Sequence, residues 1–286
     1  MREFDYYSPR SIDEAIELLA GQDLHLLAGG TDLLLGMREG KVAPHALMSL
    51  KRIPELRAIH QTEKAGLKLG AMVTLRQIAR DRSIRDHYPC LSETALLMAS
   101  EQVRTLATVG GNLCNAAPSA DMAPPLIALE AAVRLIGPGG ERRMPLEKFF
   151  LGPGSTALES AELLAEIEVP PTERLTRYVR LTPRANMDIA IVGVAAGIQL
   201  NKSEVQSARI VLGAVAPIPL RVRHAEEALI GKHLTLETIE AAATIAAEEC
   251  SPISDVRGSD WYRRRMVGVL LKRVLGSIHE AELAAA

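Results

Sequence analysis

A pair of prolines, Pro170 and Pro171, divides the 286-residue chain into two parts of different character. Proline has no backbone N–H to donate to a neighbouring strand, so the apolar run 163–169 must end at the pair. Before the pair, helical and strand patterns alternate; after it, strand-like runs precede helix-like runs. Strands followed by helices are typical of an antiparallel sheet covered by helices. The sequence therefore predicts an α+β protein with a domain boundary near residue 173.

The composition is that of a folded globular chain and excludes several classes of protein. Apolar residues make up 48% and charged residues 24%, which excludes a disordered or collagen-like chain. The 33 Lys and Arg nearly balance the 35 Asp and Glu, so the chain lacks the basic surface of a non-specific nucleic-acid binder. The N-terminal residues lack the apolar centre of a secretion signal, and the longest apolar stretch, 189–198, is about half of a membrane span. We expect a cytoplasmic protein with no membrane span.

The cysteines are too few and too far apart for an iron–sulfur cluster. Cys90, Cys114 and Cys250 form no Cys-x-x-Cys pair, whereas a cluster normally takes four thiolates. No histidine lies at ligand spacing from a cysteine, so a structural zinc is not expected either. No Ser–His–Asp or Cys–His arrangement is recognisable. We predict neither metal ligands nor catalytic side chains on this chain.

Capping patterns define several elements of the first part. Ser11 and Glu14 form a predicted capping box for a helix over 12–20, and Thr74 and Gln77 form one for a helix that follows. With a strand at 24–28, a helical turn at 33–38 and a strand at 46–50, the first 55 residues form a small α/β unit. Further predicted elements are a strand at 67–71, a helix at 92–100, a hairpin over 132–144, strands at 163–169, 176–182, 189–200 and 205–215, and helices at about 224–230, 236–249 and 259–275.

The first of two paired-glycine segments ends the strand at 24–28. Gly29 and Gly30 can adopt positive φ and let backbone N–H groups approach a phosphate closely. Thr31 adds a hydroxyl, and the N-terminus of the helix at 33–38 adds positive partial charge. The spacing is neither that of a Gly-x-Gly-x-x-Gly turn nor that of a P-loop. Taken alone, a Gly-Gly turn after a strand is more often structural.

The second paired-glycine segment is expected to be a loop from Thr108 to Pro125. It repeats the pairing of a threonine with two glycines, Gly110 and Gly111. Its polar side chains suit an extended ligand that lies against the backbone. Two such segments together predict a diphosphate held from two sides, and hence a dinucleotide-type ligand. The polar side chains are Asn112, Asn115, Ser119 and Asp121.

Asp121 has a second interpretation. It could accept a hydrogen bond from a ribose hydroxyl or a ring N–H of a ligand. It could also be the N-cap of a helix whose first turn contains Pro124 and Pro125.

The segments AGGTDLL at 28–34 and TVGGNLCNAAPSAD at 108–121 resemble the paired FAD-binding motifs of the medium, flavin-carrying subunits of molybdenum hydroxylases. This family includes xanthine dehydrogenase, aerobic carbon monoxide dehydrogenase and 4-hydroxybenzoyl-CoA reductase. Further similar stretches lie at 163–170, 180–190 and 262–264, so the resemblance spans nearly the whole chain. It implies an FAD-binding domain over 1–173, with subdomains of about 1–56 and 57–173, and a C-terminal flavoprotein-subunit domain over 174–286.

Carried over by position, the resemblance implies that FAD lies between the two glycine segments. The first segment would wrap the pyrophosphate and the second would hold its other side. Asn115 and Asp121 would bind the ribityl, ribose or phosphate portion, and Leu163 or Leu164 would pack near the flavin. The predicted cofactor-binding residues are Leu27, Ala28, Gly29, Gly30, Thr31, Asp32, Leu33, Thr108, Gly110, Gly111, Asn112, Cys114, Asn115, Asp121, Leu163, Leu164 and Arg180.

Arg180, Cys114 and Thr31-Asp32 differ from common family members. Many relatives have Lys where this chain has Arg180; a cation there would stabilise negative charge on the reduced flavin ring, although Arg180 could instead be a surface charge paired with a glutamate. Cys114 replaces a common aliphatic residue and is expected to pack near the ring. Carbon monoxide dehydrogenase relatives often have Ser or His-Ser in place of Thr31-Asp32. The four-cysteine cluster loop of some 4-hydroxybenzoyl-CoA reductase subunits is missing.

The resemblance implies an electron-transfer subunit. FAD on this chain would pass electrons between two [2Fe-2S] clusters of a small partner subunit and an external acceptor. The substrate would react at a molybdenum cofactor on a large partner subunit, in a dimer of heterotrimers. Two alternatives are a stand-alone flavin oxidoreductase of the same FAD-binding superfamily, for which no general acid or base is recognisable, and a non-catalytic nucleotide- or CoA-binding module.

Overall fold

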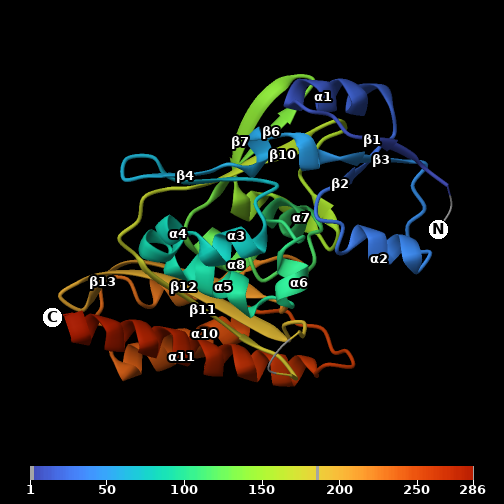
Figure 1. Cartoon of the computed structure of the whole chain (residues 1–286). Helices are drawn as coiled ribbons and strands as arrows, with labels where there is room; N and C mark the ends of the chain where they lie inside the picture. Colours follow the sequence, from blue (N-terminus) through green and yellow to red (C-terminus); the bar gives the residue numbers. More distant parts are fainter. Residues whose placement is uncertain (1–2, 185–186, 286) are drawn as a thin grey trace.

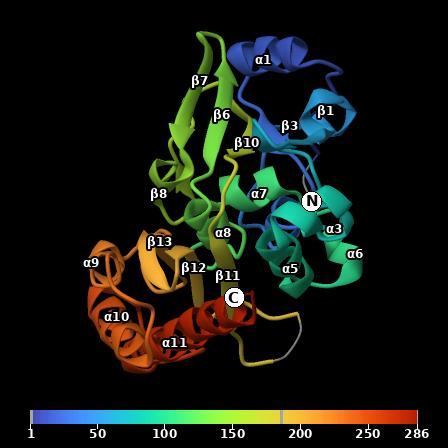
Figure 2. The same cartoon turned by 90° about the vertical axis from the view of Figure 1, so that its left-hand side faces the viewer.

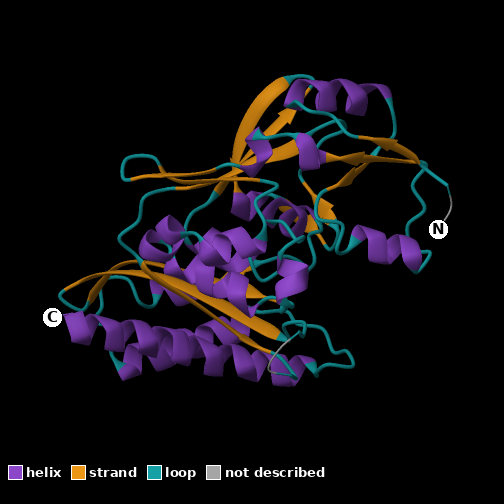
Figure 3. Ribbon diagram, in the orientation of Figure 1, coloured by secondary structure: helices purple, strands orange, loops and turns teal. Residues whose placement is uncertain are grey.

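The computed structural model describes residues 3–184 and 187–285, which form three larger sheets in chain order (Figures 1 and 3). The N-terminal unit is a parallel sheet of order β1-β3-β2, and parallel strands require crossover connections, which α1 and α2 provide. Ser11 caps α1 by accepting from the Glu14 N–H at 3.1 Å, but the Glu14 carboxylate accepts from the N–H of Arg10 instead of that of Ser11. The elements are β1 (Asp5–Tyr7), α1 (Ile12–Gly21), β2 (His25–Leu27), α2 (Leu33–Arg38) and β3 (Ala46–Ser49), followed by the 3₁₀ turns η1 (Leu50–Arg52) and η2 (Glu55–Arg57).

The middle region pairs an antiparallel sheet of order β4-β5-β10-β6-β7 with a layer of short helices. The predicted capping box of Thr74 and Gln77 is present at the start of α3. The strands of the middle region are β4 (Ile59–Thr62), β5 (Gly66–Gly70), β6 (Ala132–Gly137), β7 (Gly140–Pro145) and β10 (Leu163–Val169), with the small pair β8 (Phe150–Gly152) and β9 (Ser155–Thr156). Its helices are α3 (Leu75–Arg80), α4 (Arg82–His87), α5 (Pro89–Leu97), α6 (Glu101–Arg104), α7 (Val109–Cys114), α8 (Ala123–Ala128) and η3 (Leu146–Lys148).

The C-terminal region is an antiparallel sheet of order β11-β12-β13-β14 between two helical layers (Figure 2). Side chains alternate along β12: Val194 and Ala196 join the core under α10 and α11, whereas Ala195 joins the core of the middle region. The sheet is therefore shared by both cores. The elements are β11 (Leu175–Leu181), β12 (Val192–Asn201), β13 (Glu204–Gly213), β14 (Leu220–Arg221), α9 (Arg223–Glu227), α10 (Leu236–Glu249) and α11 (Asp260–Ala285).

The predicted α+β class with a C-terminal antiparallel sheet is confirmed, but the prediction for 108–125 is wrong. That stretch contains α7 and the start of α8 in place of one long loop. Glycine disfavours helices, yet Thr108 caps α7, and Gly110 packs closely on Ala71. The predicted boundary at 173 falls in the connection between β10 and β11.

Ion pairs join the middle region to the C-terminal sheet. Glu147 on η3 is paired with Arg223 at 2.5 Å and with Arg221 at 3.5 Å, and Arg221 also binds the buried Glu226 at 2.7 Å. Among the described residues, no helix has both the length and the apolar character required to cross a bilayer. The same residues contain no cluster of His, Cys, Asp or Glu that could hold a metal ion.

Candidate functional site

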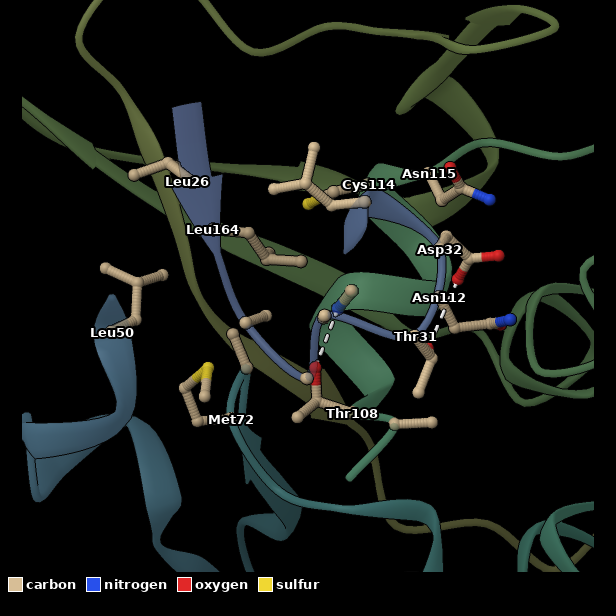
Figure 4. A pocket seen from close by; sticks show the side chains of 18 of the residues that line it. Leu26, Thr31, Asp32, Leu50, Met72, Thr108, Asn112, Cys114, Asn115 and Leu164 are labelled. Carbon is tan, nitrogen blue, oxygen red and sulfur yellow. Dashed lines mark hydrogen bonds between the residues drawn. The ribbon is translucent and has the colours of Figure 1, made fainter. Parts of the chain in front are cut away.

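A cavity of about 700 Å³ opens between the N-terminal unit and the helical layer of the middle region (Figure 4). Its walls come from segments that are far apart in the sequence: the end of β2 with the loop to α2, residues 71–75, residues 98–115 and the start of β10. Ile189, before β12, adds one residue from the C-terminal region. Pockets of this volume hold organic ligands and cofactors.

Both glycines of the first segment are required by its local geometry. A Cβ at Gly29 would lie 2.2 Å from the carbonyl oxygen of Leu106, so this position has no room for a side chain. Gly30 has φ of +82°, in the left-handed region that favours glycine. The segment thus packs against the 106–107 backbone while it turns from β2 into α2.

A run of free backbone donors follows this turn. Within residues 3–184 and 187–285, the N–H groups of Gly29, Gly30, Thr31, Asp32 and Leu33 have no hydrogen-bond partner. All these residues line the cavity. Successive free N–H groups at a turn form a concave site for an anion.

The second glycine segment differs, because its N–H groups are already used. The Val109 and Gly110 N–H groups donate to the carbonyl oxygens of Val73 and Ala71, both at 2.9 Å. The Gly111 N–H donates to the Thr108 hydroxyl at 3.0 Å, and that of Asn112 donates to the Thr108 carbonyl. The backbone of the second segment therefore has no free N–H at these four positions. The second segment contributes side chains and closely packed glycines to the wall of the cavity.

The two segments meet at Ala28 and Gly111. A Cβ at Gly111 would lie 3.6 Å from the Cβ of Ala28, in ordinary contact. The side chains of Asn112, Thr31 and Asp32 lie in the same part of the cavity lining (Figure 4). Among the described residues, the buried Oδ1 of Asn112 has no hydrogen-bond partner. A buried amide oxygen without a donor is costly, so this atom fits a ligand group that donates to it.

The cavity walls are nearly free of ionisable groups. Among the described residues that line the cavity, the ionisable side chains are those of His25, Asp32 and Cys114. Burial raises the pKa of Cys114 to about 12, so this group is a neutral thiol at pH 7. An anion bound here is held by neutral N–H donors and not by lysine or arginine.

Asp121 and Arg180 lie outside the cavity lining and bind each other. Arg180 Nη1 donates to Asp121 Oδ2 at 2.5 Å, and both side chains are more than nine-tenths buried. The Tyr178 hydroxyl donates to the other carboxylate oxygen at 2.6 Å. Burial raises the pKa of Asp121, and Arg180 and Tyr178 offset this only in part. The interpretation of Asp121 as a helix N-cap is wrong, since Met122 caps α8, and so is that of Arg180 as a surface charge.

The structure brings the remaining predicted residues together, except Leu27, whose side chain points into a small core with Met37 and Leu47. Sequence reasoning missed most of the apolar wall. These residues belong to ordinary apolar runs, and only the fold shows that they face a cavity. The lining residues that were not predicted are His25, Leu26, Leu50, Ala71, Met72, Leu75, Met98, Ala99, Val103, Ala107, Leu158 and Ile189.

Two protein-family models match nearly the whole chain. The FAD binding domain in molybdopterin dehydrogenase matches residues 2–172, and the CO dehydrogenase flavoprotein C-terminal domain matches residues 177–278.

Curated relatives are similar over almost their full length. The carbon monoxide dehydrogenase medium chain of Hydrogenophaga pseudoflava is 37% identical over 278 residues, which cover 96% of each chain. The putative xanthine dehydrogenase FAD-binding subunit of Escherichia coli K12 is 33% identical over 274 residues, 94% of each chain.

Solved structures have the same fold. A chain of the Hydrogenophaga pseudoflava carbon monoxide dehydrogenase, in a form that lacks the Mo-pyranopterin moiety, matches with a TM-score of 0.94 at 37% identity, covering 98% of both chains. A chain of quinoline 2-oxidoreductase from Pseudomonas putida 86 matches with a TM-score of 0.93 at 30% identity, also covering 98% of both chains.

Proposed function

The chain belongs to the family of FAD-binding medium subunits of the molybdenum hydroxylases, and we propose that it holds FAD in the cavity between its two glycine segments. It is an oxidoreductase subunit of this kind. The run of free N–H groups from Gly29 to Leu33 is the observation that carries the proposed position of the cofactor. The FAD pyrophosphate provides the anionic oxygens that such a run of donors binds.

The other residues of the cavity fit the remaining parts of FAD. Asn112 Oδ1, a buried acceptor without a donor among the described residues, suits a hydroxyl of the ribityl or ribose portion. Leu163 and Leu164, at the start of β10, give one wall an apolar surface against which a planar ring can pack. Apolar contact excludes water from the ring. The described lining residues include no lysine or arginine, which leaves the phosphates to backbone donors.

Arg180 was predicted to lie near the flavin ring, but its guanidinium group has protein partners. Its guanidinium binds Asp121 and the carbonyl oxygen of Leu97, next to the lining residue Met98. We therefore place this cation behind the cavity wall and not against the ring. Asp121 then acts as the partner of Arg180 in place of a direct ribose ligand.

We further propose that the chain works as an electron carrier within a larger assembly. Bound FAD supplies redox chemistry that can connect one-electron and two-electron donors and acceptors. Cys90, Cys114 and Cys250 are separate free thiols, which supports the assignment of two [2Fe-2S] clusters to a small partner subunit. A large partner subunit would hold the molybdenum cofactor and the substrate, in a dimer of heterotrimers. The cytoplasmic location stays a prediction.

The flavin proposal is tested with the purified full chain. The protein is incubated with FAD, passed through a desalting column and examined by absorption spectroscopy. We expect oxidised-flavin bands that elute with the protein at about one FAD per chain. A protein that loses all flavin in this procedure, while it remains folded by circular dichroism, would contradict the proposal and favour the nucleotide- or CoA-binding module.

The partner proposal needs a separate experiment. An affinity-tagged copy of the chain is expressed in its native host and isolated under mild conditions. We expect two further subunits, with molybdenum and iron, to elute with it. A flavin-loaded single chain that alone oxidises a substrate would instead support a stand-alone oxidoreductase.

A further inference from the structure

Two guanidinium groups bind a row of four successive carbonyl oxygens at the edge of the cavity. Arg104 Nη1 donates to the carbonyl oxygens of Leu96 at 3.1 Å, Met98 at 2.6 Å and Ala99 at 3.2 Å. Arg180 Nη2 donates to the remaining one, that of Leu97. Every carbonyl of 96–99 thus has a cationic partner, and the partners come from different regions: Arg104 from α6 and Arg180 from β11.

The segment 96–99 forms part of the cavity wall and contains a strained residue. Met98 and Ala99 line the cavity, whereas the side chains of Leu96 and Leu97 are exposed. Ala99 has φ of +46°, a left-handed conformation that disfavours residues with a Cβ. A strained backbone persists only where surrounding contacts hold it. Here the hydrogen bonds from the two arginines are among these contacts, together with that from the Met98 N–H to the Ala95 carbonyl oxygen.

We propose that Arg104 is a positioning residue for the flavin: with Arg180, it fixes 96–99 as a cavity wall and offsets the partial negative charge of the carbonyl oxygens in this wall. The proposal rests on the proposed FAD site. The row of oxygens includes the last carbonyls of α5, where partial negative charge accumulates. The hydrogen bonds from the two guanidinium groups offset this partial negative charge, which would otherwise repel an anionic cofactor in the adjoining cavity.

Arginine is required at position 104 by this geometry. One guanidinium nitrogen reaches three carbonyl oxygens, and Nη2 binds Glu101 at 3.2 Å, so the planar group is held at two corners. The side chain is 13% exposed, which limits competition from water. A lysine offers a single ammonium without this fixed plane, so it can replace only part of the interaction.

The test uses the full chain with Arg104→Met, Arg104→Lys and the matched control Arg80→Met. Arg80 also binds Glu101, at 2.9 Å, but contacts none of the four carbonyls. Two quantities are measured below the melting temperature of every variant. Amide hydrogen exchange of peptides over 96–107 is followed without FAD, and FAD affinity is measured by quenching of flavin fluorescence.

We expect Arg104→Met to speed exchange over 96–107 and to weaken FAD binding by about tenfold or more, as for a lost set of charged hydrogen bonds. Arg104→Lys should lie between Arg104→Met and wild type, and Arg80→Met should match wild type. Unchanged exchange in Arg104→Met, or equal effects of Arg80→Met, would overturn the proposal. If wild type binds no FAD, the flavin assignment is wrong, while the exchange data still decide whether Arg104 holds the wall.

Discussion

Arg180 lies 2.5 Å from Asp121 in a nearly fully buried ion pair, although 59 positions separate them in the sequence. Asp121 precedes α8 in the middle region, and Arg180 lies on β11 of the C-terminal sheet. Tyr178, two residues before Arg180 on the same strand, completes the cluster through its hydroxyl. The pair therefore connects the two halves of the chain directly behind the cavity.

Removal of either partner should leave a buried charge alone. We expect Asp121→Asn and Arg180→Met each to lower the free energy of unfolding by about 3 kcal/mol, and the double variant to cost clearly less than the sum. Urea denaturation at pH 7 gives the four values of this cycle. The half-exposed pair Lys68–Glu168 is the control and should show a coupling of at most about 1 kcal/mol. Additive losses at Asp121 and Arg180 would argue against the pairing.

The two roles of Gly30, backbone turn and cavity wall, can be separated with a matched glycine. A valine at Gly30 would have to adopt φ of +82°, which costs about 1–2 kcal/mol. Its Cβ would also lie 3.0 Å from the Leu34 side chain and 3.1 Å from that of Leu27, so the turn that presents the free N–H groups would have to shift. Gly40 has φ of +74° and open space around its Cβ position. We expect both Gly30→Val and Gly40→Val to lower the melting temperature, but only Gly30→Val to lose FAD in the desalting experiment. Normal flavin content in Gly30→Val would refute the assignment of this loop.

Thr108 holds the second segment through one hydroxyl. Thr108→Val keeps the shape of the side chain but removes the acceptor for the Gly111 N–H, so we expect a loss of about 1–2 kcal/mol of stability. Thr108→Ser keeps the acceptor and should cost less. Thermal unfolding of the FAD-free chain measures both. A loss in Thr108→Ser as large as that in Thr108→Val would show that the methyl group contributes as much to stability as the hydroxyl cap.

Acid should weaken the start of β10 through Glu162. Arg142 binds both carboxylate oxygens of Glu162 at 2.7 Å, and this pairing lowers the pKa of Glu162 below its ordinary value of 4.5. A lowered folded pKa means that the contribution is present above about pH 4.5 and is lost as the pH falls through the folded value.

Glu162→Gln should therefore be less stable than wild type by about 2 kcal/mol at pH 7, and the difference should shrink toward pH 3. Urea unfolding at a series of pH values measures it. Glu159→Gln is the control, because the Glu159 side chain is 75% exposed and lies 3.8 Å from Arg142. A difference between wild type and Glu162→Gln that does not change with pH would contradict the assignment.

The three cysteines should be inert in the folded chain. Burial raises the pKa values of Cys90 and Cys114 to about 12 and also raises that of Cys250, so few thiolates exist at pH 8. We expect no rapid reaction with a thiol reagent such as Ellman's reagent in the native protein, and three reactive thiols in urea. A rapidly reacting thiol in the native protein would show that one of these environments opens in solution.

Local signals in the sequence predicted much of the fold. The Thr74 capping box, the turn at 33–38 and the order of the C-terminal strands all appear in the structure, because each depends on neighbours in the chain. Helix α7 escaped prediction because its glycines disfavour a helix, and its stability comes from Thr108 and from contacts with Ala71. Helix α11 continues ten residues beyond the predicted end at 275, since Ile278 still packs into the core.

The sequence indicated the lining residues that belong to the two glycine motifs and missed most of the others. The residues of both glycine segments reach one cavity, as expected from their repeated pattern. The wall at 96–99 was not predicted: the helix expected at 92–100 ends at Leu97, and the backbone that follows is bound by Arg104 and Arg180, which lie elsewhere in the sequence. The pairing of Asp121 with Arg180 likewise exists only once β11 has docked on the helical layer.

The two glycine segments differ in how many of their backbone donors remain free once the chain has folded. The N–H groups from Val109 to Asn112 are all hydrogen-bonded within the described chain. Those from Gly29 to Leu33 have no partner among the described residues. In the proposed site, binding of the cofactor therefore adds new backbone hydrogen bonds at the first segment alone, against a second segment that is already complete.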